Sequence, residues 1–222
     1  MPEVFGLYLI LTEPVAGYAA CAAAAVRCQV RYLQLRMKNA PPDRILETAR
    51  RIRALTRGTQ TLFIVNDDVE IAREVDADGT HLGQNDMPLS EARRRWPVPG
   101  KRFGLSTHNA AQARLACALA PDYIGVGPVF ATPTKAVPDP ALGLPEMRKI
   151  VGASPLTTVA IGGIDRDNLA DVLGHGASNF CVVRAVNLSP EPEAAIRELQ
   201  GIWRAHMQRQ RPAKAGAQTP RS

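Results

Sequence analysis

The chain has 222 residues, of which 45% are apolar and 22% charged. This composition is typical of a globular protein, and it excludes a collagen-like, coiled-coil or largely disordered chain. The net charge is +6, but five basic and no acidic residues lie from Arg204 onward. The rest of the chain is nearly neutral, which argues against nucleic acid as a partner.

No segment indicates a membrane or secretory protein. The longest apolar run, Ala19–Val26, is too short to cross a bilayer, and residues 1–5 carry no basic stretch ahead of an apolar core. The four cysteines are scattered without a Cys-x-x-Cys pair. These features predict a cytoplasmic protein with reduced thiols and no membrane partner.

Eight short segments rich in Val, Ile, Leu, Phe and Tyr have the length of buried parallel strands. In chain order they are Gly6–Thr12, Tyr32–Arg36, Thr61–Asn66, Gly79–Gly83, Arg102–Thr107, Tyr123–Phe130, Leu156–Gly163 and Phe180–Ala185. Eight segments with helical spacing alternate with them. These are Val15–Cys28, Pro42–Arg57, Asp68–Val75, Pro88–Trp96, Asn109–Ala120, Gly143–Val151, Asn168–Leu173 and Glu191–Ala205.

Strict alternation of strands and helices predicts an α/β fold with a parallel sheet, and eight such units predict a (β/α)8 TIM barrel. An open doubly wound sheet is the alternative, but the first turn lacks the Gly-x-Gly-x-x-Gly pattern that dinucleotide-binding folds carry. We expect one domain over residues 1–206. Residues 207–222 lack apolar periodicity and predict a disordered basic tail.

In a barrel of this kind the chemistry lies where the strands end. After the second strand, Gln34, Arg36 and Lys38 alternate and so share one side, where two cations could hold a phosphate or diphosphate. A solvated strand end is an equally good interpretation of these three residues taken alone.

The third and fourth strands end in acidic residues. Asn66, Asp67 and Asp68 follow the third strand, and Asp86 follows the fourth. Asp68 is placed to cap the next helix, and Asp86 could do the same. Because Mg²⁺ prefers one or two carboxylates together with substrate phosphates, a Mg²⁺–diphosphate site on Asp67 and Asp86 is the favoured interpretation.

The remaining strand ends add polar groups suited to anions. Ser106 follows the fifth strand as a hydrogen-bond donor or a helix cap, and the long loop after the sixth carries Thr132, Thr134 and Lys135. His81 lies inside the fourth strand, which favours a barrel-lining histidine over a catalytic base. Gly162 and Gly163 after the seventh strand, with Arg184 after the eighth, predict a phosphate cup.

Seven motifs in this order resemble those of the thiamine phosphate synthase (thiamine-phosphate pyrophosphorylase) family. They are 34–38 (Gln-Leu-Arg-Met-Lys), 66–68 (Asn-Asp-Asp), 78–86 (Asp-Gly-Thr-His-Leu-Gly-Gln-Asn-Asp), 104–108 (Gly-Leu-Ser-Thr-His), 125–130 (Gly-Val-Gly-Pro-Val-Phe), 132–135 (Thr-Pro-Thr-Lys) and 161–164 (Ile-Gly-Gly-Ile). Each motif is modest, but seven in order are specific.

The resemblance implies a Mg²⁺-dependent transferase that acts on two phosphorylated substrates. It would join a hydroxymethylpyrimidine diphosphate to a thiazole phosphate by a dissociative mechanism, and a homodimer is a family expectation. The family's roles fall on the matching positions: Gln34, Arg36, Lys38 and Asn66 for the pyrimidine diphosphate; Asp67 and Asp86 for Mg²⁺; Ser106 for the diphosphate or the pyrimidine; Thr132 and Thr134 for the thiazole phosphate and Lys135 for the diphosphate; Gly162 or Gly163, with Val183 and Arg184, for the thiazole phosphate. Among these, Arg36, Lys38, Ser106 and Lys135 are the expected catalytic residues.

One position departs from the family pattern. The family usually has a Ser-Ala pair after the eighth strand, where this chain has Arg184-Ala185. Arg184 could pair with the thiazole phosphate or crowd its site, and we expect weakened or altered binding of that substrate. Two alternatives therefore stay open: a thiazole tautomerase-like relative, which would use a histidine and would not need Asp67, Asp86, Arg36 and Lys38 together, and a paralogue that binds thiamine phosphates without turnover.

Overall fold

The computed structural model describes residues 1–132 and 139–210, and these residues form a closed barrel of eight parallel strands. The strands are β1 (Leu7–Leu11), β2 (Tyr32–Leu35), β3 (Leu62–Asn66), β4 (Gly79–Leu82), β5 (Arg102–Thr107), β6 (Tyr123–Val126), β7 (Thr157–Ile161) and β8 (Phe180–Val182). Each strand pairs with its sequence neighbours, and β8 closes the ring against β1. The prediction of a (β/α)8 barrel is confirmed.

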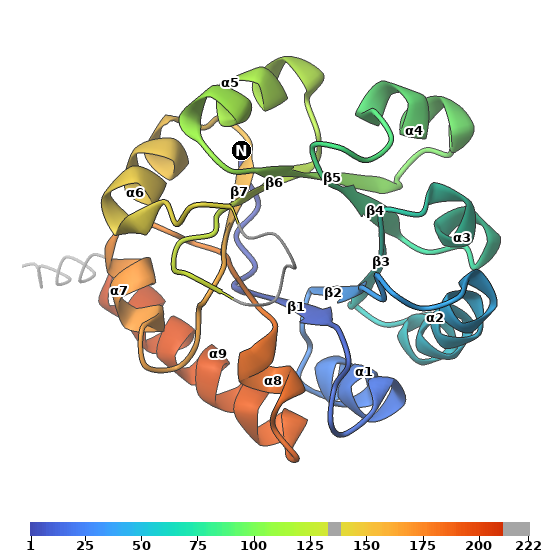
Figure 1. The fold of residues 1–222 in the computed structure, drawn as a ribbon. Helices are drawn as coiled ribbons and strands as arrows, with labels where there is room; N and C mark the ends of the chain where they lie inside the picture. Colours follow the sequence, from blue (N-terminus) through green and yellow to red (C-terminus); the bar gives the residue numbers. More distant parts are fainter. Residues whose placement is uncertain (133–138, 211–222) are drawn as a thin grey trace, which may run out of the picture.

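Helices form a ring around the outside of the barrel (Figure 1). They are α1 (Tyr18–Arg27), α2 (Pro42–Thr56), α3 (Val69–Glu74), α4 (Leu89–Arg95), α5 (Ala110–Leu119), α6 (Gly143–Ala153), α7 (Leu169–Gly174), α8 (Arg184–Asn187) and α9 (Pro192–Arg209). Asp68 caps α3 as expected, because its side chain accepts a hydrogen bond from the Ile71 N–H at 2.8 Å. No helix of the described residues is long and apolar enough to cross a membrane.

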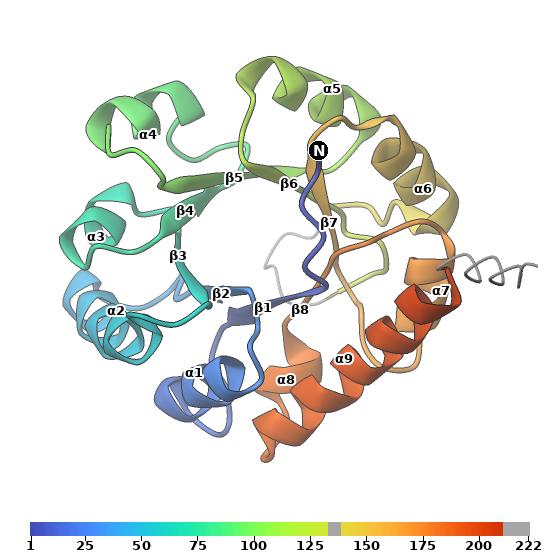
Figure 2. The same cartoon turned by 180° about the vertical axis from the view of Figure 1, so that it is seen from behind.

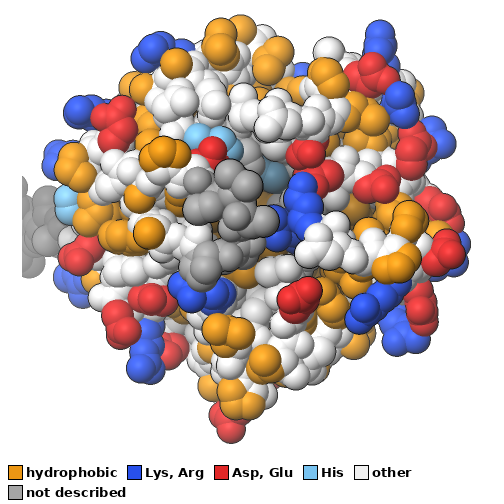
Figure 3. All heavy atoms as spheres, viewed as in Figure 1, with side chains coloured by type: hydrophobic (Ala, Val, Ile, Leu, Met, Phe, Trp, Pro, Cys, Tyr) orange, Lys and Arg blue, Asp and Glu red, His pale blue; other side chains and the backbone are white. Residues whose placement is uncertain are grey.

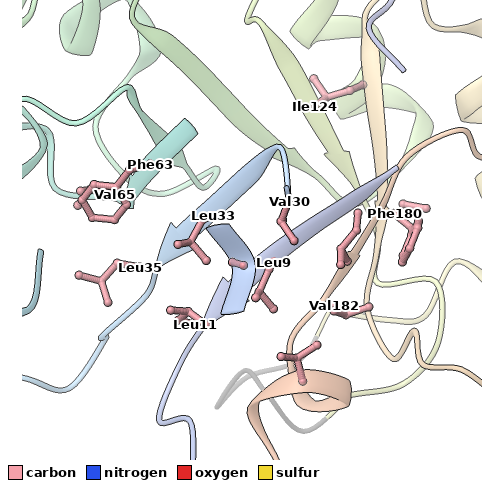
Figure 4. Close-up of a cluster of buried hydrophobic side chains, with 14 of the residues drawn as sticks. Leu9, Leu11, Val30, Leu33, Leu35, Phe63, Val65, Ile124, Phe180 and Val182 are labelled. Carbon is pink, nitrogen blue, oxygen red and sulfur yellow. The ribbon is translucent and has the colours of Figure 1, made fainter. Parts of the chain in front are cut away.

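Alternation along the strands sorts the buried side chains into two layers. One set, which includes Leu9, Leu33 and Phe63, packs with helix side chains in the large outer core (Figure 4). The alternate residues form a second, smaller cluster inside the barrel, centred on Tyr8, Tyr32 and Tyr123. The interior is therefore a packed core, with aromatic rings in contact across it. It lies below the mouth of the barrel, the end at which the strands terminate.

An acidic or amide residue directly before β4, β6 and β8 fastens the start of a neighbouring strand. The Asp78 carboxylate accepts a hydrogen bond from the Phe63 N–H, and the Asp122 carboxylate accepts one from the Phe103 N–H, both at 2.8 Å. Asn179 precedes β8 and is only 2% exposed. These contacts hold in register the N-terminal ends of the strands, which form the lower end of the barrel.

The segment before β1 crosses the lower end of the barrel (Figure 2). Asn179 anchors it: its Oδ1 accepts from the Phe5 and Gly6 N–H groups, and its Nδ2 donates to the Glu3 and Thr158 carbonyls. The Phe5 ring packs on Tyr32 with 4.6 Å between ring centres. The lower end is closed in this way, and the site must lie at the other end.

Several expected boundaries differ from the structure. The sixth strand ends at Val126 rather than at 130, because the Val129 and Phe130 N–H groups leave the sheet ladder and bond to the carbonyls of Ile161, the last residue of β7, and Gly162, which follows it. The eighth strand ends at Val182, and a short helix that sequence analysis did not predict starts at Arg184. Helix α9 continues to Arg209, past the expected domain boundary at 206, and residues 211–222 of the predicted tail lie outside the described residues.

We predict that Asn179→Ala destabilises the protein by about 3 kcal/mol, because it leaves several buried backbone groups without partners. In urea unfolding, the urea concentration at the midpoint should fall, while the dependence of the unfolding free energy on urea concentration should not change. Asn85→Ala is the matched control, since Asn85 is exposed and its loss should cost under about 0.5 kcal/mol. Equal midpoints for the two variants would show that Asn179 does not anchor the lower end.

Candidate active site

Two carboxylates meet at the upper ends of β3 and β4. Asp67 follows β3 with φ of 63°, a left-handed conformation that few residues other than glycine, asparagine and aspartate adopt. Its N–H donates to the His81 carbonyl at 2.9 Å, which fixes it against β4. Asp86 turns back toward the end of β4 and accepts a hydrogen bond from the Gly83 N–H at 2.7 Å. The Asp67 and Asp86 carboxyl groups are in hydrogen-bonding contact.

This contact perturbs both acids. Burial and the hydrogen bond with Asp86 raise the pKa of Asp67 to about 6. Burial also acts to raise the pKa of Asp86, but hydrogen bonds from Asp67 and from the Gly83 N–H outweigh it, so the pKa falls below its usual value. The pair behaves as two like charges that share a proton, and such a pair attracts a cation.

Two cations from the end of β2 face the carboxylates. Lys38 forms an ion pair with Asp67, and 45% of the Lys38 side chain is exposed. Arg36 is more buried: burial lowers its pKa, while the charges of Asp67 and Asp86 oppose this fall. Basic and acidic side chains meet near the centre of this face (Figure 3). The structure therefore brings together the four charged residues that the sequence predicted for the Mg²⁺–diphosphate site, while Asp68 caps α3.

Next to this charged cluster lies a cavity of about 340 Å³ at the ends of β5 to β8. Its floor is apolar and includes Ile10, Ile161 and Cys181. The predicted site residues in its wall are Arg36, Ser106, Thr132, Gly162, Gly163, Val183 and Arg184. Arg36 thus borders both the cavity and the carboxylates.

Gly162 and Gly163 form the part of the wall that follows β7. Both have positive φ, 102° and 66°. A Cβ on Gly162 would lie 2.5 Å from the Pro128 Cα, and one on Gly163 would lie 2.7 Å from the Phe130 Cβ. Only glycine fits either position, because the segment after β6 packs closely against both. Both glycines line the cavity, where their backbone could form a phosphate cup.

The other residues predicted for the site differ in how deeply they are buried. Asn66 is half-buried at the end of β3. Gln34 lies inside the barrel at 1% exposure, and its Nε2 donates to the Tyr8 hydroxyl at 2.8 Å. Arg184 is exposed at the start of α8, and its guanidinium has no carboxylate partner among the described residues. Thr134 and Lys135 lie outside the described residues.

Sequence analysis missed two features of the site. His81 lines the barrel as expected, but its Nε2 also lies 2.9 Å from the Ser106 Oγ. The sequence predicted no role for His108, yet it borders the cavity: its Nδ1 donates to the Gly127 carbonyl at 2.7 Å, and its Nε2 lies 3.6 Å from the Asp139 carboxylate. The alternation of side chains along β4 could have predicted the contact of His81 with Ser106, because His81 occupies an inward-facing position of the strand.

Comparisons with known proteins show the family and the fold of this chain. Residues 7–186 match the family described as thiamine monophosphate synthase. A thiamine-phosphate synthase of Anaeromyxobacter dehalogenans is 41% identical over 90% of this chain and 88% of its own. One of Methanoregula boonei is 41% identical over 87% of this chain and 91% of its own.

Among solved structures, thiamine phosphate pyrophosphorylase from Pyrococcus furiosus is 33% identical, with a TM-score of 0.81 over 91% of this chain and 97% of its own. A 3-hexulose-6-phosphate synthase from Salmonella typhimurium, 15% identical with a TM-score of 0.67 over 90% of this chain and 99% of its own, shares the fold alone.

We predict that Asp67→Asn stabilises the metal-free protein at pH 7.5. The folded pKa of Asp67, about 6, exceeds its usual value of 3.8, so the folded state binds more protons and loses stability as pH rises between these values. Asparagine removes the charge and tolerates the left-handed backbone. After screening by solvent we expect a gain of ~1 kcal/mol, or a Tm about 2–4 °C higher.

The gain should vanish near pH 3, which lies below both pKa values, so that Asp67 is largely protonated in both states. Thermal scans in a chelator at both pH values check this. A lower Tm for the variant at pH 7.5 would show that the Lys38 ion pair outweighs the cost of burying the Asp67 charge beside Asp86.

Proposed function

The chain belongs to the thiamine monophosphate synthase family, and we propose that the mouth of its barrel carries out the family's reaction. The activity is thiamine phosphate synthesis. In the reaction that the resemblance implies, a hydroxymethylpyrimidine diphosphate would join a thiazole phosphate, and diphosphate would be released. One observation supports this location above the others. Arg36 lines the cavity and also faces the Asp67–Asp86 pair, which joins a site for a diphosphate to a site for a second phosphate.

We propose that Asp67 and Asp86 hold Mg²⁺. A divalent cation fits them because its charge would offset the burial and the contact with Asp86 that together raise the pKa of Asp67. The described residues contain no group of three or more His, Cys, Asp or Glu side chains placed to hold a metal. Substrate diphosphate and water would therefore complete the ligand set, as is common for Mg²⁺. When bound, Mg²⁺ would stabilise the negative charge on the departing diphosphate.

The chain's own cations would act on the same leaving group. Lys38 is exposed enough to turn from Asp67 toward a diphosphate oxygen, whereas Arg36 is held in place by burial. Both would stabilise charge that develops as the carbon–oxygen bond breaks. This arrangement supports a dissociative reaction, in which diphosphate leaves before the thiazole nitrogen attacks. Ser106 and Asn66 would position the pyrimidine diphosphate, and Lys135 stays a prediction because it lies outside the described residues.

The opposite wall suits the thiazole phosphate. The Gly162 and Gly163 backbone has no side chain to keep a phosphate away, and Thr132 borders the same cavity. Arg184 lies on the rim, exposed and with no carboxylate partner among the described residues, so it does not fill the cavity. We propose that Arg184 binds the thiazole phosphate in place of the family's usual serine.

The relatives do not favour the tautomerase-like or the binding-only alternative, since the similar proteins are thiamine-phosphate synthases. Location in the cytoplasm is part of the proposal and is supported by four free cysteines. A homodimer, and the lack of nucleic-acid and membrane partners, stay predictions.

The reaction is tested by mixing the protein with both substrates and following thiamine monophosphate as its fluorescent oxidised form. We expect product that requires Mg²⁺, and a loss of at least about 100-fold in Asp67→Asn or Asp86→Asn, because the metal and the leaving group lose a ligand. Asp68→Asn is the control: it changes the neighbouring carboxylate, but asparagine caps a helix equally well. Equal activity in all three variants would refute the proposed metal site.

Arg184→Ser should raise the KM for the thiazole phosphate about fivefold with little change in kcat, because an exposed charge contact contributes ~1 kcal/mol. Steady-state kinetics at saturating pyrimidine diphosphate measure this. Arg166→Ser is the control, since Arg166 is also exposed but pairs with Asp167 and Glu198. An unchanged KM would contradict the proposed contact, and a lower KM would show that Arg184 crowds the substrate.

A further inference from the structure

A continuous chain of hydrogen bonds runs through the barrel interior beneath the cavity. The Gln34 Nε2 donates to the Tyr8 hydroxyl at 2.8 Å, and the Tyr8 and Tyr123 hydroxyls are 2.8 Å apart. The Tyr123 hydroxyl lies 3.3 Å from the His81 Nδ1. The His81 Nε2 lies 2.9 Å from the Ser106 Oγ. We call these five residues, which come from β1, β2, β4, β5 and β6, the inner-barrel chain.

The inner-barrel chain is built into the core. Tyr8 and Tyr123 are almost fully buried, and burial raises the pKa of both phenols above the usual range, so both stay neutral O–H groups. A Cβ on Gly104 would lie 2.2 Å from the Tyr123 ring, so the missing side chain at Gly104 makes room for that ring. The His81 and Tyr123 rings stack with 5.5 Å between their centres. Packing therefore holds the polar groups in line.

The direction of hydrogen-bond donation along the inner-barrel chain follows from Gln34, its first member. The Gln34 amide nitrogen donates to the Tyr8 oxygen, which leaves the Tyr8 hydrogen for Tyr123, its other hydrogen-bond partner among the described residues. The Tyr123 hydrogen then points to the His81 Nδ1, which accepts. A neutral imidazole that accepts at Nδ1 carries its hydrogen on Nε2, and that hydrogen points to the Ser106 Oγ.

We propose that Tyr8, Tyr123 and His81 are positioning residues that fix Ser106 as a hydrogen-bond donor to the substrate. Because the Ser106 oxygen accepts from His81, its own hydrogen is directed at the cavity that Ser106 lines. The partner must then be an acceptor, such as a ring nitrogen or a phosphoryl oxygen, and not an amino group. This inference rests on the proposed role of Ser106 in binding.

Nitrogen NMR on histidine-labelled protein tests the direction without any measurement of activity. The chain has four histidines, and the His81 signals are those that disappear in His81→Gln. At pH 8 we expect a protonated Nε2 and an unprotonated Nδ1 in His81. In Tyr123→Phe the Nδ1 loses its donor, so the two tautomers should mix. A protonated Nδ1 in the wild type would overturn the proposal even if the enzyme is fully active.

Tyr32→Phe is the matched control for Tyr123→Phe. Tyr32 is also a buried tyrosine inside the barrel and stacks on Tyr8, but its hydroxyl donates to Glu3 at the lower end, 3.1 Å away. We expect the His81 tautomer in Tyr32→Phe to match that of the wild type. The same shift in both variants would mean that general loosening of the interior, and not the Tyr123 hydroxyl, controls His81.

Kinetics of two histidine variants separate positioning from packing. A glutamine amide reaches the place of Nε2 and can still donate to Ser106, whereas the shorter asparagine reaches only the place of Nδ1. We expect His81→Gln to stay within about threefold of wild-type kcat/KM, and His81→Asn to lose about 10- to 100-fold, as Ser106→Ala does.

The double variant His81→Asn/Ser106→Ala should be no worse than Ser106→Ala alone, because His81 acts through the serine. Additive losses, or equal losses in His81→Gln and His81→Asn, would overturn the proposal.

Discussion

The pleat of the closed barrel is the constraint on which both core and site depend. Successive side chains along a strand point to opposite faces, so Leu33 and Leu35 pack toward the helices while Tyr32 and Gln34 lie inside. Because the strands are parallel, the inward rows all end at one mouth. Arg36 continues the row of β2, which is why a charged side chain stands directly above a packed interior.

Residues at the mouth of the barrel lower the stability of the fold, whereas residues at the lower end raise it. Asp67 adopts a left-handed backbone, and its carboxyl group contacts that of Asp86. Strain and like charge in one place are typical of sites shaped for a ligand and not for stability. Hydrogen bonds from Asn179, Asp122 and Asp78 hold the opposite end of the strands. Because stabilising and destabilising residues lie at opposite ends, the site can lower the stability of the protein without disrupting the barrel.

Much of this arrangement could be predicted from local patterns. Apolar segments in alternation with helical ones were enough for the barrel, and the place of Asp67 and Asp86 after adjacent strands predicted their contact. Strand ends were less predictable: the apolar residues Val129 and Phe130 look like strand, yet their N–H groups bond to carbonyls at and just after the last residue of β7. Whether a segment continues a strand depends on the neighbouring chain, which a local pattern does not contain.

By itself the sequence determined the fold class, the family and the kinds of residue at the mouth, because periodicity and motif order are local properties of the chain. Only the tertiary structure decided which groups touch. Tyr8 and Tyr123 are 115 positions apart, and their hydroxyls meet only because the barrel closes with one register and one curvature. The same closure places His81 against Ser106 and Arg36 beside two carboxylates. Hydrogen-bond partners inside a barrel are set by this global geometry, which no short segment specifies.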